Sequence, residues 1–365
     1  MAITKIPAAG FTGNNFRNII INGDMSIAQR GTSESGITSG GYFTVDRFRN
    51  GETGLGTWTQ SQSTDVPSGQ GFSNSLKMDC TTADAAPAAG DFLYVGQLIE
   101  GQNLQYLKKG TANAESVTMS FWVKSNKTGT YICELYDNDN TRQISKSYTI
   151  DTADTWEKKT ITYAGDTTGA FDNDNALSLY CIFWLGAGSS YTSGTLNTDW
   201  NSSTTANRVV GQVNLADSTS NEWYITGVQL EAGTSASDFE FLPVDVNLQR
   251  CLRYYEGGSG ASNVANVIGL PYRFCENIQS STNRLKIFGG NFLVTKRADP
   301  TITLYADSGY ATANRIGQYN GITNTLTVSS LGVGSRNHIA FYIQTSTTAS
   351  TSITYAFYYE ADAEL

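Results

Sequence analysis

Most of the chain consists of short segments in which apolar and polar residues alternate. Residues 117–125 are the clearest case, with an apolar side and a polar side: Val117, Met119, Phe121 and Val123 against Thr118, Ser120, Trp122 and Lys124. A period of two residues is typical of a β-strand that buries one face. Similar segments lie at 155–163, 177–185, 221–233 and 353–361, separated by pieces rich in Gly, Asn and Asp, which favour turns.

The composition favours the same fold class. Gly accounts for 36 of 365 residues, and charged residues for only 16%, as expected of a β-rich chain with many turns. Helical periodicity is clearest at 244–256, and 103–109 is a second short candidate. Because strands and helices do not alternate regularly, we predict an all-β protein: an N-terminal jelly-roll sandwich followed by a smaller C-terminal β-sandwich.

The chain divides into four predicted parts. Residues 22–243 are long enough for one large jelly roll, and residues 263–365 for a second β domain. Between them, residues 244–262 combine the short helix with a flexible Gly- and Ser-rich linker. Residues 1–21 contain too little patterned sequence to fold alone, so we predict an arm that lies on another structure.

The net charge of −9 argues against several classes of partner. Phosphate binding needs clustered Lys and Arg, and none occurs, so we expect no nucleic-acid partner. We expect no membrane insertion either, because no apolar run approaches the roughly 20 residues that span a bilayer. The N-terminus lacks the apolar core of a secretory signal, and the five cysteines form no C-x-x-C pair. Free thiols in a protein made in a cytoplasm are therefore the favoured interpretation.

Nothing in the residue spacing favours enzymatic chemistry. His338 is the only histidine, and it lies at the start of an apolar strand, where a polar strand end is a more common role than that of a catalytic base. Paired carboxylates for glycoside hydrolysis stay open, because the fold itself brings such pairs together. We predict that the protein is not an enzyme.

A metal site is a weaker hypothesis than a turn. The sequence DNDN occurs at 137–140 and again at 172–175, and closely spaced carboxylates such as Asp137 and Asp139 are suitable Ca²⁺ ligands. Neither copy has the Gly and Glu positions of an EF-hand, and Asp and Asn also favour hairpin turns. We favour the turn, keep Ca²⁺ as the alternative, and expect no other cofactor.

Carbohydrate binding is the best-supported ligand hypothesis. Sugar sites combine exposed aromatic rings, which stack on apolar sugar faces, with polar side chains that bond the hydroxyl groups. Trp122 falls on the polar side of its strand beside Lys124, and Tyr136 also has polar neighbours, so these three are the candidate glycan contacts. Trp58, Trp184 and Trp200 have polar neighbours too. Packing of such rings against a second sheet or a subunit interface is the more common role, and glycan contact is the alternative to it.

Several segments resemble a known family. They begin with FRNIIINGDMSIAQRGTS at 16–33 and GYFTVDRFR at 41–49, continue with SFWVKS at 120–125 and WEKKTI at 156–161, and include YITGVQLEAG at 224–233 and CLRYY at 251–255. The segments at 296–305 and 358–365 match the C-terminal part of the same family. Together they resemble virion structural proteins of tailed bacteriophages, of the tail fibre or carbohydrate-binding-module-like type.

The resemblance implies a virion component with a carbohydrate-binding-module-like jelly roll, made in the host bacterial cytoplasm. Related bacterial modules often hold a structural Ca²⁺ near an N-G-x-F-E segment and a D-D-V-x-L strand. Here residues 22–26 are NGDMS and residues 226–230 are TGVQL, so the Glu and both Asp of that pattern are missing. Asp24 is the one carboxylate that remains for such a site.

Two functions follow as hypotheses. The first is a non-enzymatic tail fibre or appendage protein that contacts host-surface glycan. The second is a capsid decoration or head-fibre protein that only grips neighbouring subunits, since low charge and many Tyr also suit interfaces. A depolymerase of the tailspike type is disfavoured, because the repeat of a β-helix is absent from the sequence.

Two features predict partners. Both faces of the C-terminal strands at 339–345 and 353–361 carry large or apolar residues, which favours burial between subunits and a homotrimer; burial within one chain is the alternative. In the arm, Ile3, Ile6, Phe11 and Phe16 are apolar but too widely spaced for one helix or strand face. We predict that they attach the protein to another virion protein. A disordered arm, or one packed on its own jelly roll, is the alternative.

Overall fold

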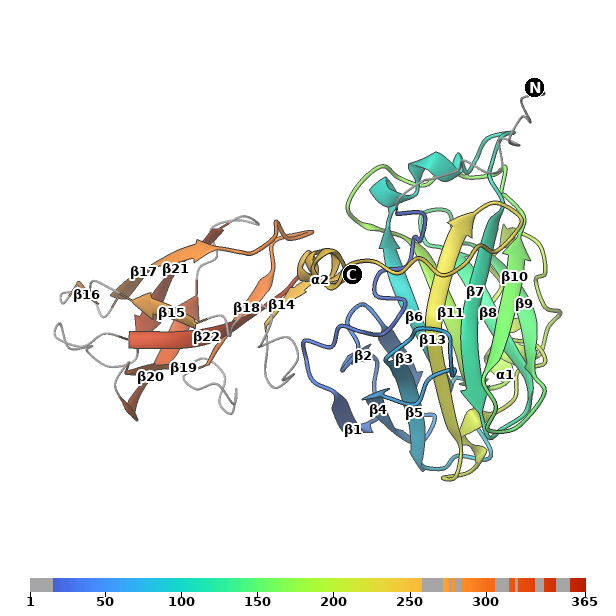
Figure 1. The fold of residues 1–365 in the computed structure, drawn as a ribbon, viewed down its shortest axis with the longest axis horizontal. Helices are drawn as coiled ribbons and strands as arrows, with labels where there is room; N and C mark the ends of the chain where they lie inside the picture. The colour runs from blue at the N-terminus through green and yellow to red at the C-terminus, as the bar shows by residue number, and fades with distance from the viewer. Residues whose placement is uncertain are drawn as a thin grey trace, which may run out of the picture.

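A computed structural model describes residues 16–257, 272–275, 278–279, 284–305, 315–318, 321–331, 338–345 and 355–365. Residues 16–243 form a two-sheet sandwich, drawn on the right of Figure 1. Its six-stranded sheet has the order β1 (Ser33–Ile37), β4 (Thr57–Ser63), β5 (Ser75–Thr82), β13 (Glu222–Ala232), β7 (Val117–Ser125) and β10 (Glu157–Tyr163). Its seven-stranded sheet has the order β12 (Asn201–Ser202), β9 (Arg142–Ile150), β8 (Gly129–Asp137), β11 (Leu177–Ala187), β6 (Phe92–Glu100), β3 (Arg49–Thr53) and β2 (Gly41–Tyr42).

The two sheets enclose one large apolar core, and adjacent strands run antiparallel. Phe121 on β7, Tyr131 on β8 and Phe183 on β11 are buried between the sheets, as the alternation in each strand requires. Strands distant in sequence are neighbours, such as β13 between β5 and β7, so connections cross the ends of the sandwich as they do in a jelly roll. The predicted all-β, jelly-roll fold class is confirmed.

The jelly roll begins earlier than the predicted boundary at residue 22. Ile19, Ile20 and Ile21 are buried, and the Ile19 N–H donates to the Leu230 carbonyl at 2.8 Å. Gly23 lies so close to Val228 that a Cβ would come within 2.0 Å of its carbonyl oxygen, which explains a glycine here. Residues 18–21 therefore belong to the sandwich and not to an arm, because three consecutive apolar residues find burial against β13 and β6.

The predicted helix is present and shorter than expected. Helix α2 (Val244–Leu252) buries Leu248, Cys251 and Leu252 against Ile21 and Ile27 of the jelly roll. It ends at Leu252 because the chain turns into β14 (Tyr255–Glu256), which pairs with β22. The candidate at 103–109 forms two 3₁₀ turns, η2 (Gly101–Asn103) and η3 (Gln105–Leu107). The rest of the predicted linker, 258–262, lies outside the described residues.

The C-terminal region is a third antiparallel sheet, drawn on the left of Figure 1. Its order is β14, β22 (Tyr355–Asp362), β19 (Arg315–Gln318), β20 (Gly321–Leu331), β21 (His338–Thr345), β17 (Arg284–Asn291) and β16 (Ile278–Gln279), with β15 (Tyr272–Cys275) and β18 (Thr301–Tyr305) also paired to β22. The side chains behind the trimer prediction, in 339–345 and 353–358, lie outside those that the structure describes.

The end of the chain returns to the jelly roll beside α2 (Figure 1). Glu364 forms ion pairs with Arg47 and, at 3.4 Å, with Arg30. Tyr254 stacks on Arg47, with 3.5 Å from the guanidinium carbon to the ring centroid, and accepts the Ala363 N–H at its carbonyl. The Glu364 ion pairs join the end of the chain to the sandwich independently of the covalent link through α2, whereas the Ala363 bond is to Tyr254, which directly follows α2.

Two further properties follow from the described residues. Cys80, Cys133, Cys181 and Cys251 are free and buried, and burial raises the pKa of the Cys133 thiol to about 12, which keeps it in its unreactive form. Over the same ranges, none of the helices has both the length and the apolar content needed to cross a membrane.

Candidate functional site

The outer face of the seven-stranded sheet carries a cluster of aromatic residues. Along β8 the side chains of Tyr131, Cys133 and Leu135 enter the core, so those of Ile132, Glu134 and Tyr136 point outward. With their neighbours on β6 and β11, the outward residues line a depression of about 250 Å³, here named the aromatic groove: Phe92, Tyr94, Tyr136, Asn138, Tyr180, Ile182, Trp184, Tyr191 and Arg208. Trp184 and Ile182 form its buried floor, and the other rings are half-buried.

The rings of the groove hold one another in place. Tyr94 packs edge-on against Trp184 with centroids 5.3 Å apart, and Tyr136 packs edge-on against Tyr180 at 6.3 Å. Register explains both contacts, because Tyr94 lies opposite Trp184 between β6 and β11, and Tyr136 lies opposite Tyr180 between β8 and β11. Rings in mutual contact lose little conformational entropy when a ligand stacks on them.

An ion pair between the buried Glu134 and the half-buried Arg208 lies beside the rings. The Glu134 carboxylate is fully buried and accepts hydrogen bonds from Arg208, at 2.9 Å to each oxygen, and from the Trp184 indole nitrogen at 2.8 Å. The guanidinium carbon of Arg208 lies 5.0 Å from the Tyr136 ring centroid and 5.1 Å from that of Trp184. The pair neutralises its own charge and fixes the rings beside it.

The loop after β11 builds one wall of the groove. It begins with Gly188 and the single turn of α1 (Ser189–Thr192), where a Cβ on Gly188 would come within 1.9 Å of the Ala88 carbonyl oxygen. The Tyr191 carbonyl accepts the Val209 N–H at 3.1 Å, which ties α1 to the segment that supplies Arg208. Tyr191 therefore contacts the floor from the side, with its ring centroid 5.7 Å from that of Trp184.

Hydrogen-bonding groups remain available around the rings. Within the described part of the chain, the hydroxyls of Tyr136, Tyr180 and Tyr191 have no hydrogen-bond partner, while the Tyr94 hydroxyl accepts from Arg49 at 3.3 Å. Burial raises the pKa of Tyr94 and that of Tyr180, so both phenols stay protonated at neutral pH. The groove thus presents aromatic faces, hydroxyl groups and no net charge.

The three predicted glycan contacts do not form one site. Tyr136 lies in the aromatic groove, whereas Trp122 and Lys124 lie on the outer face of the other sheet. There the Lys124 ammonium pairs with Asp65 and lies 4.2 Å from the Tyr224 ring centroid, so it fastens side chains together. Trp122 is half-buried between the in-register residues Thr226 and Lys158.

The predicted metal ligands are separated and occupied by other partners. The buried Asp137 carboxylate pairs with the Lys109 ammonium at 2.5 Å and caps the hairpin turn through the Asn140 N–H at 3.1 Å. Asp139 accepts the Asp172 N–H at 2.9 Å, and Asp24 accepts from Asn247 at 3.1 Å. No group of three or more His, Cys, Asp or Glu side chains gathers anywhere in the described ranges. The DNDN at 137–140 is a turn, which was the favoured interpretation.

Of the predicted attachment residues, Ile3, Ile6 and Phe11 lie outside the described residues. Phe16 lies at the edge of the jelly roll with 57% of its surface exposed. Its N–H donates to Glu240 at 2.9 Å, so the backbone is already held by the sandwich at this position.

Sequence reasoning missed most of the groove. Tyr180, Ile182 and Trp184 share one side of 177–185, so the period of two could have placed them together. Trp184 was noted for its polar neighbours, and Trp58, noted for the same reason, is instead fully buried in the core. Tyr191 and Arg208 come from a loop without any periodicity, so no sequence pattern could place them beside the groove.

No protein-family model matches the chain, and no curated protein matches it. Among solved structures, the enzymatically active domain of tailspike protein 4 from bacteriophage CBA120 is similar, at 15% identity and TM-score 0.31, over 59% of this chain and 21% of that one. The match thus spans about a fifth of the tailspike domain's length.

Carbohydrate-binding modules are similar as well. One is the N-terminal cellulose-binding domain of Cellulomonas fimi β-1,4-glucanase C, at 12% identity and TM-score 0.27, over 48% of this chain and 85% of that one. Another is the family 11 carbohydrate-binding module from Clostridium thermocellum, at 12% identity and TM-score 0.26, over 56% of this chain and 98% of that one. These likenesses concern the fold alone, and the jelly-roll assignment rests on the sheet topology.

Proposed function

We propose that this chain is a non-enzymatic structural protein of a tailed-phage virion, a tail fibre or appendage, that binds host-surface glycan in the aromatic groove. The observation that carries the binding half of the proposal is the groove itself, in which five half-buried rings surround a buried tryptophan beside a neutralised ion pair. The virion half is supported by the segments at 16–33 and 224–233, which resemble phage structural proteins.

The chemistry of the groove suits a sugar better than other ligand classes. Apolar sugar faces stack on aromatic rings, and the free hydroxyls of Tyr136, Tyr180 and Tyr191 pair with sugar hydroxyls. A strongly charged ligand gains little, because Glu134 and Arg208 already neutralise each other. An apolar ligand would leave the three hydroxyls without partners.

The same proposal includes assembly. A trimer held by the C-terminal strands presents three grooves at once, and linked sites raise avidity toward a polymeric glycan far above the affinity of one site. Attachment to the particle is assigned to the N-terminal arm. Light scattering at micromolar concentration should give the mass of a trimer; the mass of a monomer would contradict this part.

Binding is tested with the full chain on an array of bacterial surface polysaccharides. The wild-type protein and Trp122→Ala should bind the same glycans, and Tyr136→Ala should lose that binding while its thermal unfolding midpoint stays close to wild type. Folded wild-type protein that binds no polysaccharide on the array, or Tyr136→Ala that binds unchanged, would refute binding in the groove.

Two further measurements test the rest. Incubation with a bound polysaccharide should leave its chain length unchanged by size-exclusion chromatography, and shortened products would contradict the non-enzymatic assignment. Gold-labelled antibody should decorate tails or appendages in virion micrographs; a label spread over the capsid lattice would favour a decoration protein instead.

A further inference from the structure

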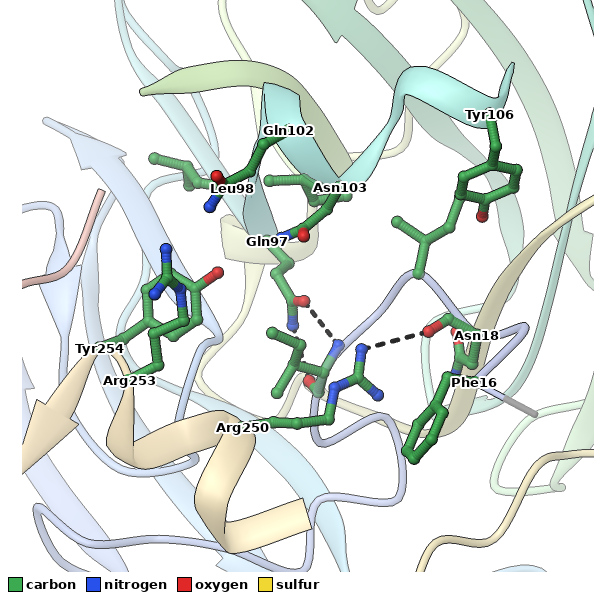
Figure 2. A pocket seen from close by; sticks show the side chains of 13 residues that line it. Phe16, Asn18, Gln97, Leu98, Gln102, Asn103, Tyr106, Arg250, Arg253 and Tyr254 are labelled. Carbon is green, nitrogen blue, oxygen red and sulfur yellow. Dashed lines mark hydrogen bonds between the residues drawn. The ribbon is translucent and has the colours of Figure 1, made fainter. Parts of the chain in front are cut away.

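A second cavity lies where the start of the jelly roll meets α2. Its volume is about 350 Å³, and three elements form its walls: residues 16–21, the end of β6 with the turns η2 and η3, and α2 (Figure 2). We name it the α2 pocket. It lies apart from the aromatic groove, and the two cavities share no lining residue.

Arg250 of α2 extends into this pocket (Figure 2). Its guanidinium donates one hydrogen bond, to the Asn18 carbonyl at 3.3 Å, and within the described residues no carboxylate lies within ion-pair distance of it. Glu240 acts on Arg250 only at longer range, because its two oxygens accept the Phe16 and Asn18 N–H groups. Most donors of this guanidinium are therefore free for a ligand.

The other cation of the pocket is already neutralised. Arg253 donates two hydrogen bonds to Glu100, at 2.9 and 2.7 Å. Among the described residues, Arg250 is the one cation of this pocket without an ion-pair partner; it is half-buried, and burial lowers its pKa. A single half-buried guanidinium matches a monoanion such as a carboxylate, in a bidentate geometry. A phosphate monoester carries about −1.5 to −2 at neutral pH and would leave charge unpaired.

The remaining groups of the pocket suit a polar ring. Tyr106 is 47% exposed and faces the cavity across from Arg250, as Figure 2 shows. In the described structure its hydroxyl and the Asn103 amide have no hydrogen-bond partner, and the Gln102 carbonyl oxygen is also free because only its nitrogen is used, at 2.5 Å from Glu100. Gln97 bonds both main-chain groups of Ile21 at 2.8 Å and serves as a fixed wall.

We propose that the α2 pocket binds the uronic-acid unit of an acidic glycan, with its carboxylate on Arg250, its ring against Tyr106 and its hydroxyls on Asn103 and Gln102. The proposal rests on the proposed function only for the class of ligand, carbohydrate. It adds a second site with its own specificity: the groove selects neutral sugar faces, and the pocket selects the acid.

The test uses the full chain and titrates glucuronate, galacturonate, glucose and acetate by calorimetry. At least one uronate should bind at least tenfold more tightly than glucose or acetate. Arg250→Gln should weaken that binding at least tenfold, and Arg250→Lys should restore part of it. Tyr106→Ala, an exposed position that folding tolerates, should weaken it less. Equal binding of acetate would overturn the sugar-ring part, and unchanged binding by folded Arg250→Gln would overturn the site.

Two controls separate this site from the groove. Tyr136→Ala should bind uronate as tightly as the wild-type protein does. If this variant loses neutral oligosaccharides and keeps uronate, the α2 pocket binds independently of the aromatic groove. An acidic peptide is tested as a competitor of uronate on the wild-type protein. If the peptide bound more tightly than uronate, the glycan assignment would be overturned in favour of a protein partner.

Discussion

The two outer faces of the jelly roll carry the same residue types and differ in shape. Each has tryptophan, tyrosine and an ion pair among its outward-facing side chains. On the six-stranded sheet, Lys124 is nearly buried, and its partner Asp65 has a side chain that is 44% exposed. On the seven-stranded sheet, Glu134 is fully buried next to the rings, and the loop 188–209 stands beside them as a wall.

The difference shows what turns an aromatic face into a binding site. A ring and a charge on the outer side of a strand can simply hold neighbouring side chains in place. Lys124 does this by contacting both Asp65 and Tyr224. A site needs a wall and a neutral floor as well, and only the face with α1 has both among the described elements. Burial of the carboxylate, more than the number of rings, separates the two faces, since Glu134 is buried and Asp65 is exposed.

The largest expected effect is on stability. Glu134→Ala leaves the half-buried Arg208 and the buried Trp184 indole N–H without their acceptor, so the free energy of unfolding should fall by about 3 kcal/mol. Asp65→Ala removes an exposed partner and should lower it by less than about 1 kcal/mol. Urea denaturation followed by tryptophan fluorescence measures both, and equal losses would contradict the comparison.

The next effect is on affinity. Tyr180→Ala removes a ring and a free hydroxyl from the groove and should weaken binding of a cognate oligosaccharide about tenfold, or about 1.4 kcal/mol. Trp122→Ala removes a larger ring from the opposite face and should leave the dissociation constant unchanged. Calorimetry with the same oligosaccharide measures both dissociation constants. If Trp122→Ala weakened binding as much as Tyr180→Ala, the assignment of the site to the seven-stranded sheet would be wrong.

A smaller effect concerns alkaline pH. Because burial raises the pKa of both Tyr94 and Tyr180, their phenols stay neutral above the ordinary value of about 10. The groove should therefore bind its glycan with the same affinity, within about twofold, from pH 6 to 9.5. A titration that weakens binding in this range would show that an ionised group, and not a neutral ring and hydroxyl, makes the contact.

The smallest effect is on acid stability at the open face. Burial alone would raise the pKa of Asp65, but hydrogen bonds from Lys124 and Trp156 lower it below 3.8 overall. A lowered folded pKa contributes stability above about pH 4, and this stability is lost as the pH falls through the folded value. Asp65→Asn should reduce the acid-induced loss by a few tenths of a kcal/mol. Thermal unfolding midpoints of the wild type and the variant, measured from pH 7 to pH 3, give this difference. An equal loss of stability in acid for both proteins would count against the pairing of Asp65 with Lys124.

The local parts of this architecture could be predicted from the sequence. The alternation in 117–125 correctly assigned Phe121 to the core and Trp122 to an outer face, since a period of two is a local property. The helix at Val244–Leu252 follows from the stripe of Leu248 and Leu252. The sequence also favoured a turn at 137–140, where Asp137 caps the hairpin.

What could not be predicted depends on pairing between distant strands. Trp122 and Tyr136 look alike in sequence, and only the pairing of β7 with β13 and of β8 with β11 places them on opposite faces. Arg208 reaches Glu134 from 74 residues away, through a loop without periodicity. Ile19 to Ile21 show no alternation, because they lie in an irregular segment whose backbone is bonded to Leu230 and Gln97.

The return of residues 359–365 to the jelly roll has a mechanical consequence. Tension applied to the C-terminal sheet reaches the sandwich by two routes: through the covalent chain at α2 and through the ion pairs of Glu364 with Arg47 and Arg30. Because bending would have to break the second connection, we expect the junction to be stiffer than a single linker would make it. Because the Arg47 pair is buried, added salt should change this stiffness very little.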